Sequence, residues 1–214
     1  MTIVVEILLC ILIGYALGCI SPSVILSKLL HRNLREEGTG NYGATNVTMV
    51  LGRGFGAFVM LFDIAKGAFS YLIASWIFTE LAYAGLISGI AAMIGHCFPF
   101  YTGFKGGKGL AAYGGVVLAY DPLIFLIVIT IVIILMLIVN YSFIFPYAGS
   151  FLVCVLATLK AQNLVVFAIW ALMAALIMIK HFPNLKRALK STDIGVRDYI
   201  VKHIFKKQKG AGGK

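Results

Sequence analysis

Residues 123–139 read LIFLIVITIVIILMLIV, and Thr130 is the only polar side chain in this run. A helix needs about 20 mostly apolar residues to cross the hydrocarbon core of a bilayer. An uncharged run of this length is typical of a membrane-spanning helix, so we interpret the chain around it as a membrane protein.

Six other apolar runs flank this one. They cover residues 3–20 (continuing through 24–30 after a bend expected at Ser21-Pro22), 55–78, 81–98, 110–120, 143–159 and 164–179. We predict an all-α, polytopic membrane helix bundle with seven transmembrane spans. The run 110–120 is short for a span, so the alternative is six spans with a re-entrant segment at 110–120.

The overall composition agrees with this prediction. Hydrophobic residues make up 61% of the 214-residue chain and charged residues 12%, whereas soluble domains average about 45–50% and about 25%. A disordered tail protein, a disulfide scaffold and a two-domain soluble enzyme are thereby excluded. We expect a single membrane domain over residues 1–200, followed by a basic cytosolic tail over 201–214.

Small residues inside the spans predict how the helices pack. Two patterns, Gly14-x-x-x-Gly18 and Gly85-x-x-x-Gly89, permit close approach of neighbouring helices. The cysteines lie in apolar stretches without CxxC spacing, and we interpret them as small packing residues; they are Cys10, Cys19, Cys97 and Cys154.

The distribution of charge orients the bundle. If successive connections alternate between the two sides, all of the 18 basic residues except Lys160 fall on one side, with Lys66 counted near its end of the second span. The other side carries Glu6, Glu80 and Asp121. The positive-inside rule places the basic side in the cytosol, so we expect an external N-terminus and a cytosolic C-terminus.

The first cytosolic connection contains the glycine-rich segment GTGNYGATN at residues 38–46. Gly38, Gly40 and Gly43 match G-x-G-x-x-G, but a dinucleotide site requires a βαβ unit, and the flanks here are membrane helices. Closely spaced glycines still let successive backbone N–H groups converge on an anion. The alternative is a flexible polar hairpin between two spans.

A second cytosolic connection reads GFKGGKG at residues 103–109. Lys105 and Lys108 among these glycines predict another anion site made of backbone amides and cations. The segment is not a P-loop, which would require glycine at Thr102 and a serine or threonine at Gly109. No magnesium nucleotide is therefore expected.

Further polar residues accompany the spans. His181, Asn184 and Arg187 lie where the last span leaves the membrane. Asp63 and Lys66 are three residues apart on one helix face and can pair; such groups in a span serve function or pair for structure, and both interpretations stay open. The histidines lack acidic neighbours at ligand spacing, so no metal site is expected.

Two anion sites, a histidine and several hydroxyl groups thus gather at one face of an apolar bundle. This arrangement suits an enzyme that joins a phosphorylated polar substrate to an apolar one at the membrane surface. A transporter would instead be expected to bury its polar site near the bilayer midplane.

At these residues the chain resembles the bacterial acyl-phosphate-dependent glycerol-3-phosphate acyltransferases, the PlsY family. The motifs occur in the family's order over nearly the whole chain. They are GTGNYGATN at 38–46, Asp63-x-x-Lys66-Gly67, Gly95-His96-x-Phe98-Pro99 followed by FKGGKG at 104–109, Tyr141-Ser142, and His181-x-x-Asn184-x-x-Arg187. The family's seven spans and external N-terminus agree with the topology predicted above.

The resemblance implies transfer of a fatty acyl group from acyl phosphate to glycerol 3-phosphate, which yields lysophosphatidic acid for phospholipid synthesis. It implies a multi-pass protein of the bacterial cell membrane whose active site faces the cytosol, with no cofactor and no metal. The expected partners are the two substrates, membrane lipid and the soluble enzyme that produces acyl phosphate. No nucleic acid is expected.

The resemblance also implies roles for individual residues. Thr39, His181 and Asn184 are expected to be catalytic. Residues expected to bind the phosphate or acyl phosphate are Gly38, Gly40, Asn41, Gly43, Asn46, Arg53, Lys105, Gly106, Gly107, Lys108 and Ser142. Those expected to be structural polar residues are Asp63, Lys66, His96 and Arg187.

The chain departs from the family's pattern at several positions. Thr39 replaces a serine, Met49 an arginine, Phe143 a serine and Asp193 a glutamate. Arg53 follows Met49 by four residues, so in a continuous helix it would share a face with position 49 and could bind the same anion; otherwise it is a positive-inside anchor. The departures leave open an alternative function, a non-enzymatic or retargeted membrane paralogue that binds or transports a lipid or phosphate ester.

Overall fold

The computed structural model describes residues 2–190, so the basic tail 201–214 and Asp193 lie outside the described residues. All secondary structure in this range is helical, which confirms the all-α prediction there. The helices are α1 (Ile3–Cys19), α2 (Pro22–Leu29), α3 (Ala44–Leu51), α4 (Arg53–Ile77), α5 (Ala84–Cys97), α6 (Leu110–Tyr120), α7 (Pro122–Val139), α8 (Ile144–Ala161) and α9 (Leu164–Leu189), with a short 3-10 helix, η1 (Phe100–Thr102).

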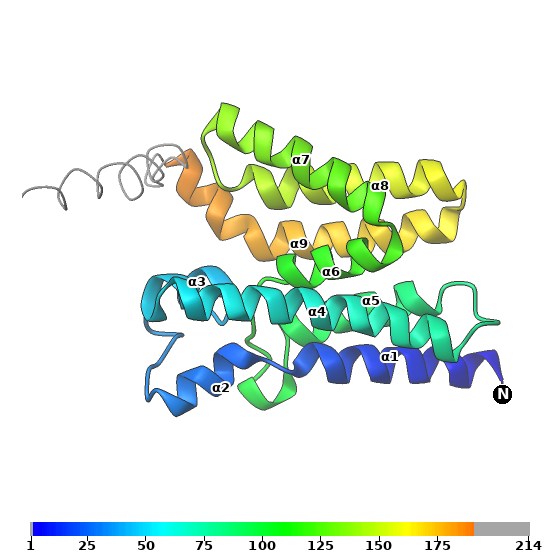
Figure 1. Ribbon diagram of the computed structural model, residues 1–214, viewed down its shortest axis with the longest axis horizontal. Coiled ribbons are helices and arrows are strands. Elements are labelled where there is room, and N and C mark those ends of the chain that lie inside the picture. Colours follow the sequence, from blue (N-terminus) through cyan, green and yellow to red (C-terminus); the bar gives the residue numbers. More distant parts are fainter. Residues whose placement is uncertain (1, 191–214) are drawn as a thin grey trace, which may run out of the picture.

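The helices form two layers joined by α6 (Figure 1). In one layer α1, α4 and α5 pack against one another, and in the other α8 packs between α7 and α9. Between the layers, α6 contacts α4, α5 and α7. The largest apolar core follows this path from α5 to α9 and includes Met93, Tyr113 and the fully buried Trp170.

Six helical segments are long and apolar enough to cross a membrane. They are Ile3–Leu29, Arg53–Ile77, Ala84–Thr102, Pro122–Val139, Ile144–Ala161 and Leu164–Leu189. The chain is therefore a multi-pass membrane protein, as expected. α6, with 11 residues, is too short by this criterion, so the seven-span count stays a prediction. The connection between α5 and α6 lies partway along the bundle rather than at its end (Figure 1).

The first span is broken at Ser21-Pro22, as predicted. α1 ends at Cys19, Ile20 and Ser21 are extended, and α2 begins with Pro22, because proline is tolerated in the first helical turn but not in a helix interior. The ammonium Nζ of Lys66 donates a hydrogen bond to the Ile20 carbonyl across 2.8 Å. A carbonyl that the break exposes inside the bundle is thereby satisfied.

Glycines allow a close contact between α1 and α5. A Cβ atom added at Gly14 would overlap the Ser88 carbonyl of α5, and one added at Gly18 would overlap the Ala92 carbonyl. The two helices can therefore approach backbone to backbone only because both positions lack a side chain. The close packing predicted from Gly14-x-x-x-Gly18 is confirmed.

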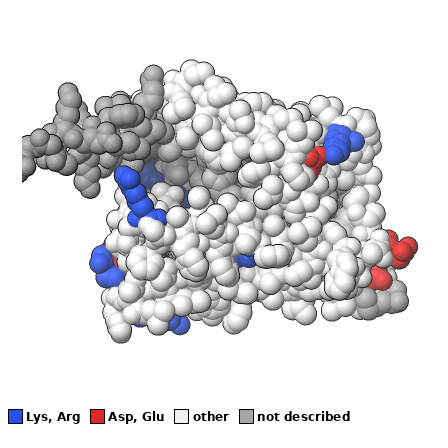
Figure 2. Space-filling view, in the orientation of Figure 1, with Lys and Arg blue, Asp and Glu red and all other residues white. Residues whose placement is uncertain are grey.

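Charged side chains are segregated along the bundle axis. Figure 2 shows most of the visible Lys and Arg side chains at the end that carries α2 and α3, and most of the visible acidic side chains at the opposite end. At the acidic end, Lys160 pairs with Asp121 at the junction of α6 and α7. Of the polar connections of interest, the loop before α3 lies at this basic end, and the connection between α5 and α6 lies partway along the bundle.

Candidate active site

Asn46 organises the first glycine-rich loop. Its buried carboxamide Nδ2 donates to Leu34 O across 2.6 Å and to Asn41 O across 2.8 Å. Its Oδ1 accepts from the backbone N–H of Thr39 at 2.5 Å and from the Thr39 hydroxyl at 3.2 Å. Both amide hydrogens and the acceptor are used within the loop, so the side chain of Asn46 fixes the shape of this segment.

Two glycines allow the loop to wrap around this carboxamide. Gly38 and Gly40 have φ values of 61° and 70°, in the left-handed region where a side chain is costly. A Cβ atom at Gly38 would also overlap Asn46 Oδ1. Asn41 adds a further link, because its Oδ1 accepts from the N–H of Gly43 across 2.8 Å.

The loop delivers the chain to the N-terminus of α3, with Gly43 as the N-cap residue. The first amides of a helix have no acceptor within the helix, and the helix dipole favours an anion at this end. On the other side of the loop, the Arg32 guanidinium pairs with Glu37 and, by its hydrogen bonds, lowers the pKa of that partly exposed carboxyl. The first glycine-rich loop is thus held by the start of α3 at one end and by this ion pair at the other.

The second glycine-rich connection folds back on the end of α5. The N–H of Gly106 donates to Cys97 O across 3.0 Å, and the N–H of Gly107 donates to His96 O across 3.1 Å. A Cβ atom at Gly106 would overlap His96 O, and one at Gly107 would overlap the His96 ring. These two amides cap α5, so the prediction that they bind an anion is revised.

Lys108 meets the end of α9 at Asn184. The Lys108 ammonium donates to Asn184 Oδ1 across 2.6 Å, and the Arg187 guanidinium donates to the same oxygen across 2.9 Å. The structure therefore brings together an expected catalytic residue, an expected phosphate-binding residue and an expected structural one. We call these three residues the α9 cluster.

His181 lies one helical turn before Asn184 and is buried. Its Nδ1 lies 2.9 Å from the carbonyl oxygen of Ile177. Because a carbonyl only accepts, Nδ1 carries the proton, and in the neutral ring Nε2 is then the acceptor. The backbone of α9 therefore sets the tautomer of this histidine.

Asp63, Lys66 and His96 form a buried cluster between α4 and α5. Lys66 Nζ lies 2.8 Å from Asp63 Oδ1, and His96 Nδ1 lies 3.3 Å from the same oxygen. The predicted pairing of Asp63 with Lys66 is confirmed. The further bond from Lys66 to Ile20 O also stays within the fold, which favours the structural role for this cluster.

The continuous helix from Met49 to Arg53 is not present. α3 ends at Leu51, Gly52 has a φ of 99°, and α4 begins at Arg53. The helical geometry that would let Arg53 replace a cation at position 49 is therefore wrong for this chain, and both side chains are exposed. Ser142 lies exposed in the connection between α7 and α8, at the end of the bundle that carries α3 (Figure 1).

Two residues that the sequence analysis missed reach the end of α5 from other helices. The Tyr15 hydroxyl of α1 donates to Phe98 O across 3.0 Å. The Lys180 ammonium of α9 donates to Cys97 O across 3.3 Å. In the sequence, each of these two residues could be recognised only as a polar group in or beside an otherwise apolar run.

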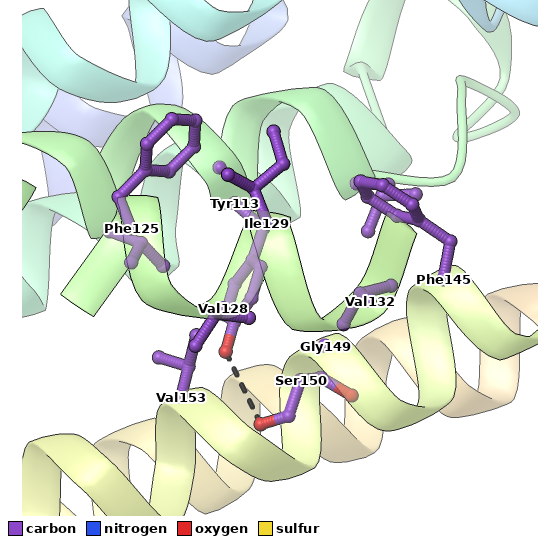
Figure 3. Close-up of a pocket in the computed structure, with 12 residues that line it drawn as sticks. Tyr113, Phe125, Val128, Ile129, Val132, Phe145, Gly149, Ser150 and Val153 are labelled. Atoms are coloured by element: carbon purple, nitrogen blue, oxygen red, sulfur yellow. Dashed lines mark hydrogen bonds between the residues drawn. The ribbon is translucent and has the colours of Figure 1, made fainter. Parts of the chain in front are cut away.

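The described residues include the linings of two apolar cavities. One, of about 50 Å³, lies among α6, α7 and α8 (Figure 3). It begins at Leu110, two residues after Lys108, and Tyr113, Phe125, Val128 and Gly149 are among its lining residues. The other, of about 370 Å³, lies beside the break between α1 and α2 and is lined by residues that include Val24, Lys28 and Tyr101.

This geometry defines a class: a polytopic membrane protein with cations, a histidine and a helix N-terminus at the basic end of an apolar bundle. The chain belongs to the glycerol-3-phosphate acyltransferase family, whose model matches residues 8–191.

Relatives and solved structures agree. A glycerol-3-phosphate acyltransferase of Macrococcus caseolyticus is 38% identical over 192 residues, covering 88% of this chain and 96% of the relative. One of Rhizobium meliloti is 37% identical over 187 residues, covering 87% and 90%. The crystal structure of PlsY, an integral membrane glycerol 3-phosphate acyltransferase, in its glycerol 3-phosphate form is similar with a TM-score of 0.82 and 31% identity, over 88% of this chain and 94% of that one.

Proposed function

We propose that this chain transfers a fatty acyl group from acyl phosphate to a hydroxyl of glycerol 3-phosphate and so forms lysophosphatidic acid. The observation that carries the proposal is the α9 cluster, which sets two cations around one neutral amide oxygen beside an apolar bundle. Membership of the glycerol-3-phosphate acyltransferase family supports the acceptor. The donor follows from the resemblance to the acyl-phosphate-dependent enzymes.

The reaction needs positioning more than a strong base. The acceptor hydroxyl oxygen attacks the acyl carbon, the bond from that carbon to the phosphate oxygen breaks, and inorganic phosphate leaves. The hydroxyl proton passes to a phosphate oxygen of the acceptor. Because acyl phosphate is already activated, the protein has to hold two anions together and offset their repulsion.

The proposed roles follow from the contacts. Lys105, Lys108 and the first amides of α3 bind phosphate groups, and Asn184 aligns Lys108 with Arg187. His181 Nε2 accepts a hydrogen bond from the hydroxyl of glycerol 3-phosphate that does not react, because Nδ1 is committed to Ile177 O. The other residues that the sequence predicts to be catalytic or to bind substrate keep those proposed roles. Asn46, Gly106 and Gly107 instead act through the shape of their loops.

Only the part of the acyl chain next to the phosphate would enter the cavity among α6, α7 and α8, because about 50 Å³ is too small for a whole fatty acyl chain. This cavity is almost wholly apolar and begins two residues after Lys108 along the chain.

We also propose seven spans in a single domain over residues 1–200, with the N-terminus outside and the site facing the cytosol. The basic end of the bundle in Figure 2 supports this orientation by the positive-inside rule. A basic cytosolic face also suits delivery of acyl phosphate by a soluble enzyme. Reporters inserted after Lys190 and at Gln162 should register as cytosolic and external; both on one side would contradict the seven-span topology.

The decisive experiment measures lysophosphatidate formation by the purified protein from glycerol 3-phosphate and either palmitoyl phosphate or palmitoyl-CoA. We expect turnover with the acyl phosphate alone. Lys108→Met should raise KM for the phosphorylated substrates roughly ten- to a hundredfold, as expected for loss of one charge-assisted contact. Lys186→Met on α9 is the charge-matched control and should leave the kinetics unchanged.

Two outcomes would contradict this proposal in different ways. Turnover with palmitoyl-CoA but not with palmitoyl phosphate would overturn the donor and keep the acceptor. Binding of glycerol 3-phosphate without turnover from either donor would favour the non-enzymatic paralogue.

A further inference from the structure

Lys180 links two parts of the site that are distant in sequence. Its ammonium donates to the Cys97 carbonyl at the last residue of α5 across 3.3 Å. The same ammonium lies 4.5 Å from the centre of the Phe98 ring. One side chain of α9 thus contacts α5 through both a hydrogen bond and a cation–π interaction.

The end of α5 is a favourable place for this cation. The last carbonyls of a helix lack partners within the helix and carry the negative end of its dipole. Here Cys97 O accepts from both Gly106 N–H and Lys180 Nζ. The ammonium therefore contacts the same carbonyl that anchors the segment leading to Lys108.

Because Lys180 contacts this shared carbonyl, it can influence the distance between Lys108 and Asn184. Lys108 follows Gly106 by two residues, and Asn184 follows Lys180 by about one turn of α9. The Lys180 contact and the bond from Lys108 to Asn184 therefore join the same two segments at neighbouring points. If the Lys180 contact is lost, the end of α9 can shift relative to the segment that carries Lys108.

We propose that Lys180 is a positioning residue for the phosphate site: it holds α9 against the end of α5 and so sets the geometry between Lys108 and Asn184. This inference rests on the proposed acyl transfer. Lys180 acts through the α5–α9 junction and not by contact with substrate.

The test compares three variants of the full-length protein in detergent, with palmitoyl phosphate and glycerol 3-phosphate as substrates. Lys180→Met keeps the length of the side chain and removes the charge. Lys180→Arg keeps a donor and a cation, and Phe98→Leu removes the ring while leaving the backbone acceptor in place. Lys186→Met is the matched control, because Lys186 lies 4.8 Å over Phe182 within α9 itself and makes no hydrogen bond or ion pair with a second helix among residues 2–190.

We expect Lys180→Met to lower kcat/KM roughly ten- to a hundredfold, since a misplacement of about 1 Å has effects of this size. KM for glycerol 3-phosphate should rise more than kcat falls. Phe98→Leu should cause a smaller loss in the same direction, Lys180→Arg should restore most of the activity, and Lys186→Met should have no effect.

Several results would overturn the inference. If Lys180→Met lowers only the melting temperature and leaves kcat/KM unchanged, Lys180 has only a stabilising role. If Lys180→Met lowers kcat/KM while Phe98→Leu does not, Lys180 acts on substrate directly. A wild-type protein that shows no acyl transfer would refute the proposed function itself. The role of Lys180 is tested separately, by comparing variants that are active.

Discussion

The ammonium of Lys108 and the side-chain oxygen of Asn184 lie 2.6 Å apart although 76 residues separate them in the chain. Arg187 donates to the same oxygen. A neutral amide orders these two cations without itself neutralising either of them. The site at the end of α9 is therefore assembled by tertiary folding, because α9 alone would place Asn184 beside Arg187 only.

Replacement of Asn46 by aspartate tests the first loop. Asn46→Asp sets a carboxylate against the carbonyls of Leu34 and Asn41, which can only accept. We expect a loss of about 1–3 kcal/mol for the buried groups left without partners, a lower melting temperature and reduced acyl transfer. Asn33→Asp is the control, because Asn33 Oδ1 accepts from Arg35 N–H and a carboxylate can do the same. A wild-type melting temperature for Asn46→Asp would contradict the role given to this residue.

Replacement of Gly18 by alanine tests the contact between α1 and α5. The added methyl group would overlap the Ala92 carbonyl, so the helices must separate and the melting temperature should fall. Gly54→Ala is the matched control, because among the described residues no atom beyond its chain neighbours and its own helix backbone lies within 4 Å of its added Cβ. Alanine favours a helix over glycine by about 0.5–1 kcal/mol, so this control should not be destabilised. Equal melting temperatures for both variants would show that the close approach is not needed.

Replacement of Asp121 tests the cap of α7. Its carboxylate accepts from the N–H groups of Leu123 and Ile124 at 2.8 and 3.1 Å and pairs with Lys160. Asp121→Ala should cost about 1 kcal/mol, as for other N-cap residues. Lys160→Met should cost less, because its side chain is 64% exposed. Melting temperatures that rank the two variants the other way would contradict this assignment.

The effect of Asp121 should depend on pH in one direction. The hydrogen bond from Lys160 lowers the pKa of the Asp121 carboxyl below its ordinary value of 3.8. The stabilisation is then complete above 3.8 and is lost as the pH falls through the lower pKa of the folded state. The difference in melting temperature between wild type and Asp121→Ala should stay constant through the neutral range and shrink in acid.

Filling the cavity among α6, α7 and α8 tests the place proposed for the acyl chain. A Cβ atom at Gly149 would lie 3.7 Å from Val132 Cγ2, an ordinary contact, so Gly149→Ala fits. Gly149→Leu would occupy the space itself. We expect Gly149→Leu to favour acyl phosphates with shorter chains, with Gly149→Ala close to wild type, measured as relative rates over a series of chain lengths. An unchanged profile would place the chain elsewhere.

The sequence predicts the helices better than it predicts the contacts of the loops. An uninterrupted apolar run, a proline after a serine and a GxxxG pattern each act locally, so the spans, the break at Pro22 and the close approach at Gly18 could be predicted. The partners of Gly106 and Gly107 could not, because whether an amide points at a ligand or at a helix end depends on how the loop folds back. The amides of these two glycines point at the end of α5.

The contacts of Asn46 and Lys180 were hidden for a similar reason. Asn46 belonged to a recognisable motif, but its four partners within the loop come from the folded shape of that segment. Lys180 lay next to an expected catalytic histidine and passed as another basic residue at the membrane boundary. The break at Gly52, in contrast, could be predicted from the sequence. A glycine beside Arg53 already argues against a continuous helix, and the helix does break there.

The shortness of α6 has a consequence for the surrounding lipid. With 11 residues at 1.5 Å per residue, it measures roughly 17 Å, whereas a bilayer core is about 30 Å thick. The hydrophobic mismatch falls on the hairpin that carries Lys108, so the bilayer has to thin there or admit water. Turnover should therefore respond to membrane thickness, with faster acyl transfer in vesicles of short-chain phospholipids than in vesicles of long-chain ones.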